Sequence, residues 1–257
     1  MRLEFNLRVK EQRTLPINYQ YPISAWIYRT LQTGNPELSA WLHRHGYEHN
    51  GRHYKHFTFS PLRPGEYRIQ GDRLEIKSAQ ARLKISFAAL ETAKPFLIGA
   101  FQGLEFFIGD RASRAEFATV AIESIPQPDF QTTMTYRTVS PVCISTGQRN
   151  RNGRLQPQYL APDHSDYASI FIENIRNKCQ SINGQVPNGV QTGFECLSKP
   201  RSKLITIKAG TPQESRVRGY EFTFRLTAPV ALHRMGWDSG FGQNNSLGFG
   251  FCEPVEG

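Results

Sequence analysis

The sequence predicts an α+β protein made of two tandem βαββαβ units, the ferredoxin-like plan. Three observations predict it. The length of 257 residues suits two domains of roughly 125 residues each. Stretches of strand and of helical periodicity follow one another in a similar order in both halves. Pro126-Gln127-Pro128 interrupts that order near the middle, which predicts an N-terminal domain over residues 1–126 and a C-terminal domain over residues 129–257.

The first half begins with a strand, because apolar residues alternate with polar ones from Leu3 to Val9. A helix is predicted next, from the apolar stripe at positions 23, 27 and 31. Asn35-Pro36-Glu37 predicts the start of a second helix, with Asn as the cap and Pro at the first helical position, and Gly46 predicts its end. The remaining predictions are strands at 54–60, 67–70 and 73–87, a short helix at 93–102 and a strand at 117–125.

The second half repeats this order less clearly. A strand is predicted to start at Phe130, and a helix is predicted over residues 165–181. The remaining predictions are strands at 204–208 and 220–226, a helix at 228–236 and a final strand at 247–252. RRM-like sheets that bind RNA usually carry an aromatic-rich motif on a central strand. Both halves lack that motif, which argues against a simple binder of single strands.

Residues 240–250, here called the glycine loop, carry the most distinctive pattern. Two Gly-Phe-Gly triplets bracket five residues, four of them polar. Because glycine permits positive φ and close approach of another molecule, the pattern predicts a loop whose N–H groups converge on an anion. Phe241, Phe249 and Phe251 are expected to hold it against the core. The alternative is a glycine-rich turn before an edge strand.

Charge and cysteine content narrow the class of protein. The formal net charge is +9, and the excess of Lys and Arg is spread over both halves. An even basic surface favours a polyanion, of which nucleic acid is the commonest, although many basic proteins simply carry a solvated positive face. The four cysteines form no C-x-x-C pair, which indicates reduced thiols in a cytoplasmic protein. No apolar run is long enough for a membrane span, and the first residues alternate like a strand rather than a secretory leader.

Five of the seven histidines lie within fourteen residues, at positions 43, 45, 49, 53 and 56. Such a cluster favours proton transfer or metal binding. Metal is the weaker interpretation, because Glu48 is the only carboxylate nearby and no cysteine accompanies it. Helical geometry predicts that His45 is packed, whereas His43 lies roughly 140° from Leu38 and points outward. Tyr28 lies at a similar angle from Ile23, so the two side chains could share a site or simply be surface residues.

Four segments together resemble one protein family. They are the glycine loop, Trp26-Ile-Tyr28-Arg, Trp41-Leu-His43 and Lys55-His-Phe-Thr-Phe-Ser60. These segments are similar to those of the CRISPR-associated endoribonucleases that cut precursor CRISPR RNA within its repeats, a branch of the repeat-associated mysterious protein superfamily. The resemblance implies that Tyr28, His43 and Lys55 occupy the catalytic positions. The stretch before Lys55 is long here, which leaves Arg52 as an alternative third residue.

The resemblance also implies a reaction that needs no metal and no cofactor. The ribose 2′-OH attacks the adjacent phosphorus and expels the 5′-oxygen, which leaves a 2′,3′-cyclic phosphate and a 5′-hydroxyl. His43 would act as general base or general acid, Tyr28 would position or deprotonate the 2′-OH, and Lys55 would stabilise charge in the transition state. A non-catalytic RNA-binding subunit of the same superfamily is the alternative function.

The expected partner is CRISPR repeat RNA. The residues predicted to bind it lie in the glycine loop and in a polar basic loop, and either loop could equally be solvated. They are Gly240, Gly242, Gln243, Asn244, Asn245, Ser246, Gly248 and Gly250 in the first, and Arg149, Arg151 and Arg154 in the second. Contacts with subunits of a CRISPR effector complex, and the choice between monomer and homodimer, stay open at this point.

Overall fold

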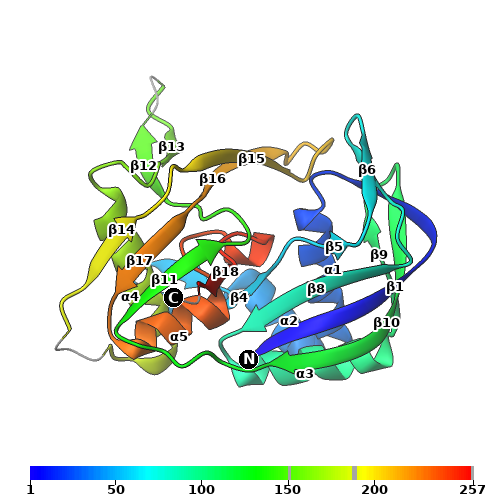
Figure 1. Cartoon of the computed structure of the whole chain (residues 1–257), viewed down its shortest axis with the longest axis horizontal. Helices are drawn as coiled ribbons and strands as arrows, with labels where there is room; N and C mark the ends of the chain where they lie inside the picture. Colours follow the sequence, from blue (N-terminus) through cyan, green and yellow to red (C-terminus); the bar gives the residue numbers. More distant parts are fainter. Residues whose placement is uncertain (150–151, 187–189, 256–257) are drawn as a thin grey trace.

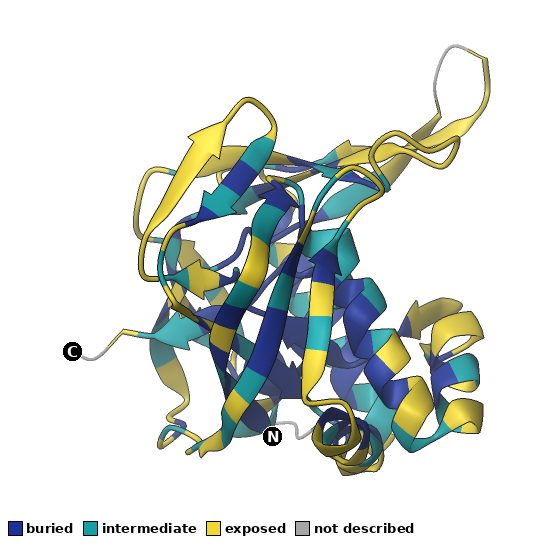
Figure 2. Ribbon diagram, turned by 90° about the vertical axis from the view of Figure 1, so that its right-hand side faces the viewer, coloured by how far each residue is buried: buried dark blue, intermediate teal, exposed yellow. Residues whose placement is uncertain are grey.

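The computed structural model describes residues 1–149, 152–186 and 190–255 of the chain. It contains two α+β units side by side, each with a principal antiparallel sheet covered by helices on one face (Figure 1). Along the strands of the N-terminal sheet, buried residues alternate with exposed ones (Figure 2). Within the described ranges, no helix is both long and apolar enough to cross a membrane.

The N-terminal unit is built around β1 (Arg2–Pro16), which pairs with β8 on one side and β10 on the other. Its main sheet has the strand order β4-β8-β1-β10-β9, and the first four of these, with α1 and α3, form the predicted βαββαβ unit. The other elements of this half are α1 (Gln20–Gly34), α2 (Pro36–Arg44), β2 (Tyr47–His49), β3 (Arg52–Tyr54), β4 (Phe57–Phe59), β5 (Arg63–Pro64), β6 (Tyr67–Gln70), β7 (Arg73–Ile76), β8 (Gln80–Phe87), α3 (Leu90–Gln102), β9 (Glu105–Gly109) and β10 (Arg114–Ile125).

The C-terminal unit repeats the plan with a sheet in the order β14-β17-β11-β18. Two hairpins, β12–β13 and β15–β16, are added to it. Its elements are β11 (Thr133–Thr138), β12 (Ser145–Arg149), β13 (Leu155–Tyr159), α4 (Tyr167–Asn183), β14 (Gly193–Cys196), β15 (Arg201–Ile207), β16 (Ser215–Glu221), β17 (Thr223–Thr227), α5 (Val230–Ser239), the 3-10 turn η1 (Asn245–Leu247) and β18 (Cys252–Pro254). The predicted fold class, tandem ferredoxin-like units, is confirmed.

Some predicted elements have different limits. Residues 73–87 form two strands, because the chain bends between Ile76 and Gln80. The predicted last strand at 247–252 is wrong over most of its length. Gly248 and Gly250 have φ values of 81° and 74°, which are left-handed and incompatible with an extended strand, so β18 begins only at Cys252.

The helices of the N-terminal unit touch through two glycines. A Cβ atom added to Gly34 would lie 1.9 Å from the Pro95 carbonyl oxygen, and one added to Gly99 would lie 1.9 Å from the Thr30 carbonyl oxygen. The backbones of α1 and α3 are therefore in direct contact. This contact fixes the position of α1, the helix that carries Tyr28.

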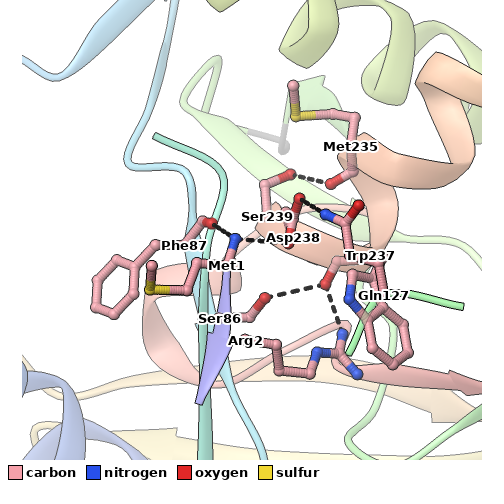
Figure 3. A network of polar contacts seen from close by, with 9 residues as sticks. All are labelled: Met1, Arg2, Ser86, Phe87, Gln127, Met235, Trp237, Asp238 and Ser239. Carbon is pink, nitrogen blue, oxygen red and sulfur yellow. Dashed lines mark hydrogen bonds and ion pairs between the residues drawn. The ribbon is translucent and has the colours of Figure 1, made fainter. Parts of the chain in front are cut away.

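The two units join around a buried arginine at the start of β1 (Figure 3). Arg2 is 1% exposed, and its guanidinium donates to the carbonyl oxygens of Trp237 and Cys252 at 2.5 and 3.1 Å. The same group lies over the rings of Trp237 and Phe251, 3.3 and 4.0 Å from their centroids. Beside it, the Met1 amino group pairs with Asp238 at 2.9 Å. The N-terminal sheet is thus bonded directly to α5 and β18.

Candidate functional site

Tyr28 and His43 come together across a tight connection between α1 and α2. Asn35 ends α1 and caps α2, with its side chain accepting a hydrogen bond from the Leu38 N–H at 3.0 Å. Ser39 Oγ donates to the Tyr28 carbonyl oxygen at 3.0 Å and holds α2 against α1. As a result the rings of Tyr28 and His43 lie edge to face, with their centroids 5.1 Å apart. The sequence predicted that these side chains could meet, and the structure brings them together.

The two rings differ in their surroundings. His43 is exposed, whereas Tyr28 is half-buried and also packs against Phe57, with ring centroids 5.5 Å apart. Burial raises the pKa of the Tyr28 hydroxyl well above its usual value, because the charged phenolate would be poorly solvated. At neutral pH this hydroxyl is therefore a hydrogen-bond donor and not a base.

Lys55 completes the group predicted from sequence. Its Nζ donates to the carbonyl oxygens of His43 and His45, at 3.0 and 3.1 Å, where the carbonyl groups at the end of α2 need donors. Burial lowers the pKa of this amine. Lys55 thus touches the backbone of His43, and its charge lies at the negative end of the helix dipole. Arg52, the alternative, is exposed at the start of β3.

The neighbouring histidines have other environments. His45 is exposed, so the prediction that it is packed is wrong: α2 ends at Arg44, and the helical stripe does not extend to the next residue. His56 is instead the buried one, and its Nε2 lies 2.7 Å from Ser181 Oγ. In the described part of the chain, no three His, Cys, Asp or Glu side chains are placed to hold a metal ion.

The glycine loop connects α5 to β18 and lies between the two units, where η1 packs near β4 and α1. The N–H groups of Phe241, Gln243 and Gly250 are bonded to backbone carbonyl oxygens. The prediction that N–H groups of the loop converge on an anion is therefore wrong for these three N–H groups, because each already has a partner within the protein. Carbonyl oxygens converge instead, and the group they surround is the ammonium of Lys178 on α4.

Sequence reasoning missed Lys178. A signal was present, since Phe171, Asn174, Ile175 and Lys178 follow helical spacing along the buried side of α4. A lysine on such a stripe must find polar partners inside the protein. The sequence did not show which partners those would be.

The predicted RNA-binding residues of the glycine loop fall into two groups. The four glycines are buried, and Asn245 is 9% exposed with its amide bonded inside the loop. Gln243 is bonded to Ser145 at the base of the β12–β13 hairpin. Asn244 is exposed, with its Nδ2 donating to Cys143 Sγ at 3.3 Å, and Ser246 is half-exposed.

A cavity of about 570 Å³ joins these features. Its walls come from residues 52–56, from α4, from the glycine loop and from the β12–β13 hairpin. Lys55 lies on one wall, and Asn244 and Ser246 lie on another. The cavity therefore joins Lys55 to the outward side of the glycine loop, while His43 and Tyr28 lie outside its lining.

The described residues of the basic loop predicted at 149–154 lie at the end of the β12–β13 hairpin, which projects from the C-terminal unit (Figure 1). Arg149 is exposed and donates to the Gly153 carbonyl oxygen at 2.9 Å. Arg154 is exposed as well, while Arg151 lies outside the described residues. The hairpin thus presents its described arginines to solvent, away from the core of the unit.

Two protein families match this chain. Residues 125–254 match the family described as CRISPR associated protein Cas6, C-terminal, and residues 14–117 match CRISPR-associated protein Cas6, N-terminal. Since the first match covers half of the chain, the protein belongs to the Cas6 family of CRISPR-associated proteins.

Individual relatives match all or nearly all of the chain. The CRISPR-associated endoribonuclease Cas6 1 of Methanocaldococcus jannaschii is 27% identical, with 100% of this chain and 93% of the relative covered. The CRISPR-associated endoribonuclease Cas6 of Pyrococcus furiosus is 26% identical, with 95% of this chain and 84% of the relative covered. A solved structure titled CRISPR associated protein Cas6 is 25% identical with a TM-score of 0.77, and the match covers 100% of this chain and 99% of that one.

Proposed function

We propose that this protein is an endoribonuclease that cuts precursor CRISPR RNA within its repeats. The observation that carries the proposal is the Tyr28–His43 ring pair, with Lys55 bonded to the backbone of His43, in a member of the Cas6 family. The names of two relatives support the same activity, since both are called CRISPR-associated endoribonucleases. The partner is then CRISPR repeat RNA, and the protein works in the cytoplasm.

The proposed reaction is a transesterification. The ribose 2′-oxygen loses its proton and forms a bond to the adjacent phosphorus, while the bond from phosphorus to the 5′-oxygen breaks and that oxygen gains a proton. The products carry a 2′,3′-cyclic phosphate and a 5′-hydroxyl. His43 moves one of these protons, because imidazole can gain and lose a proton near neutral pH. No metal ion is required for these steps.

The raised pKa of Tyr28 favours one of its two candidate roles. A neutral phenol does not take the proton from the 2′-OH, so Tyr28 donates a hydrogen bond that positions the reacting oxygen. Two of the three Lys55 N–H donors bind the carbonyls at the end of α2. The third is left to stabilise charge on the phosphorane-like transition state.

The cavity beside Lys55 supplies a path for the RNA. Asn244 and Ser246 offer polar groups to phosphate or base edges, and the exposed Arg149 and Arg154 contact the RNA backbone. Basic side chains of this kind give sequence-independent affinity that weakens with salt. The positively charged hairpin tip is therefore proposed to hold RNA beyond the cut.

The test is cleavage of a labelled repeat RNA in EDTA, with binding measured in parallel. His43→Ala is expected to lower the single-turnover rate by about 10²-fold or more without weakening binding. His45→Ala is the matched control, because its exposed imidazole lies two residues away, and it should cut like wild type. A deoxyribose at the cut should stop the reaction.

Three results would contradict the proposal. If wild type binds the repeat and never cuts it, the protein is a non-catalytic RNA-binding subunit. If EDTA stops cutting and added Mg²⁺ restores it, the metal-free reaction is wrong. If His45→Ala loses as much activity as His43→Ala, the assignment of His43 is wrong.

A further inference from the structure

Lys178 is a buried lysine whose partners all belong to the glycine loop. It lies on α4, is 2% exposed, and its Nζ donates to the carbonyl oxygens of Gly240 and Gly242 at 2.7 and 2.6 Å. Its third bond, at 2.5 Å, goes to Asn245 Oδ1. An ammonium has three donors, so this one loop uses all of them. These partners are neutral oxygens rather than a carboxylate.

Asn245 extends this arrangement to the far end of the loop. Its Nδ2 donates to the carbonyl oxygens of Phe241 and Phe249, each at 3.0 Å. Lys178 and Asn245 together therefore hold four carbonyl groups that come from both Gly-Phe-Gly triplets. The left-handed φ values of Gly240 and Gly242, 86° and 68°, belong to the same turn. A residue with a Cβ atom would be strained there.

The outer side of the glycine loop borders the cavity. With its backbone held from inside, the loop presents Asn244 and Ser246 to the same cavity that Lys178 and Lys55 border. Lys178 itself is too buried to be a main contact for RNA.

We propose that Lys178 is a positioning residue that fixes the glycine loop in the shape that binds RNA. The inference rests on the proposed function, because it takes the outer side of this loop to be an RNA-binding surface. Arginine could not replace the lysine, since its planar fork cannot direct three donors from a single point. A methionine would fill the space but leave the Gly240 and Gly242 carbonyl oxygens without this donor.

The charge of Lys178 makes the loop sensitive to pH. Burial lowers the pKa of Lys178 to about 7. The three oxygen atoms bonded to its Nζ stabilise the ammonium form. Of the titratable groups facing it, His56 on the segment before β4 stays neutral, because burial lowers its pKa to about 3. Cys252 on β18 stays protonated, because burial raises its pKa. Loss of this proton would turn a lone pair of the neutral amine toward one of the three oxygens, so the loop is expected to loosen as pH rises.

As pH rises, the stability of the whole fold should increase, whereas the glycine loop should loosen. The folded pKa of Lys178 lies below the unfolded value, so between about pH 7 and 10.5 the unfolded chain binds more protons at this site. The contribution of Lys178 to the free energy of unfolding therefore rises with pH in this window. RNA affinity is expected to fall over the same window. If Lys178 only stabilised the fold, RNA affinity would not fall while the free energy of unfolding rises.

The test compares wild type with Lys178→Met and with Lys94→Met, which removes an exposed lysine from α3. The measurements are the dissociation constant for a labelled repeat RNA at pH 6.5 and 8.5, the single-turnover cleavage rate at saturating RNA, and amide hydrogen exchange of residues 240–250. Lys178→Met is expected to weaken binding by about tenfold or more at pH 6.5 and to expose the loop amides. Its cleavage rate at saturating RNA should change much less, because the reacting groups are untouched.

Wild type alone gives a second readout if Lys178→Met does not fold. Corrected protection of the loop amides should decrease from pH 6.5 to 8.5 while protection of β1 and β8 does not. The inference is overturned if protection of the loop does not change, or if a folded Lys178→Met binds and exchanges like Lys94→Met. If Lys178→Met binds normally while wild type cuts RNA, the inference alone fails. If wild type binds no repeat RNA at all, the proposed function fails together with it.

Discussion

Gly99→Ala tests whether the position of α1 depends on backbone contact with α3. The added Cβ would lie 1.9 Å from the Thr30 carbonyl oxygen and 3.1 Å from the Gly34 nitrogen. Ordinary contact begins at 3.4 Å, so the two helices must separate by about 1.5 Å or the backbone must bend. On helix propensity alone, alanine in place of glycine would stabilise α3 by up to about 1 kcal/mol. Overpacking costs about 1–3 kcal/mol, and contact with rigid backbone atoms puts this case at the upper end, so after the propensity gain is subtracted we expect a net destabilisation of about 1–2 kcal/mol.

The same displacement should affect activity, because Thr30 lies two residues after Tyr28 in α1. A misplacement of about 1 Å can cost about 10²-fold in rate, so cleavage should fall well beyond the loss of folded protein. Stability is measured by urea denaturation, and activity by single-turnover cleavage at a temperature where both proteins are folded. Gly103→Ala is the control, since its Cβ would meet only the Gly99 carbonyl oxygen, at 3.5 Å. An unchanged or raised stability of Gly99→Ala would refute the reasoning.

Three further predictions test other parts of the molecule. Arg2→Met should lower the free energy of unfolding by about 2–4 kcal/mol, because the Trp237 and Cys252 carbonyl oxygens lose a buried charged donor. A loss below about 1 kcal/mol in urea denaturation would contradict this. Tyr28→Phe should slow cleavage with RNA affinity unchanged, and wild type should show no gain in rate toward pH 10 from ionisation of Tyr28, because burial raises the pKa of that hydroxyl. A rate increase that Tyr28→Phe removes would instead make Tyr28 a base. Burial lowers the pKa of His56 to about 3, so its contribution to stability is present above pH 6.5 and is lost as pH falls, by about 2 kcal/mol at pH 5. His56→Gln should flatten the stability curve between pH 7 and 5, and parallel curves would show that another group is responsible.

Local patterns in the sequence predicted much of the fold correctly. The alternation in β1 and the Asn35-Pro36 start of α2 are confirmed, because each depends on neighbours along the chain. The same local geometry placed Tyr28 and His43 off the apolar stripes of their own helices. The breaks at Ile76 and at Gly248 were missed, because there φ values and sheet pairing, rather than hydrophobicity, end the strand.

By itself, the sequence therefore predicted the plan of two βαββαβ units, although not β14, and it selected Tyr28, His43 and the glycine loop as candidates. Only the tertiary structure decided that Lys55 binds the end of α2 and that the carbonyl groups of the glycine loop surround Lys178. The physical reason is the distance along the chain over which each interaction acts. Periodicity and capping act over a few residues, whereas Lys178 and Gly240 are separated by 62 positions in the chain. Which buried donor meets which carbonyl group depends on how α4 and the loop pack, and no local pattern encodes that packing.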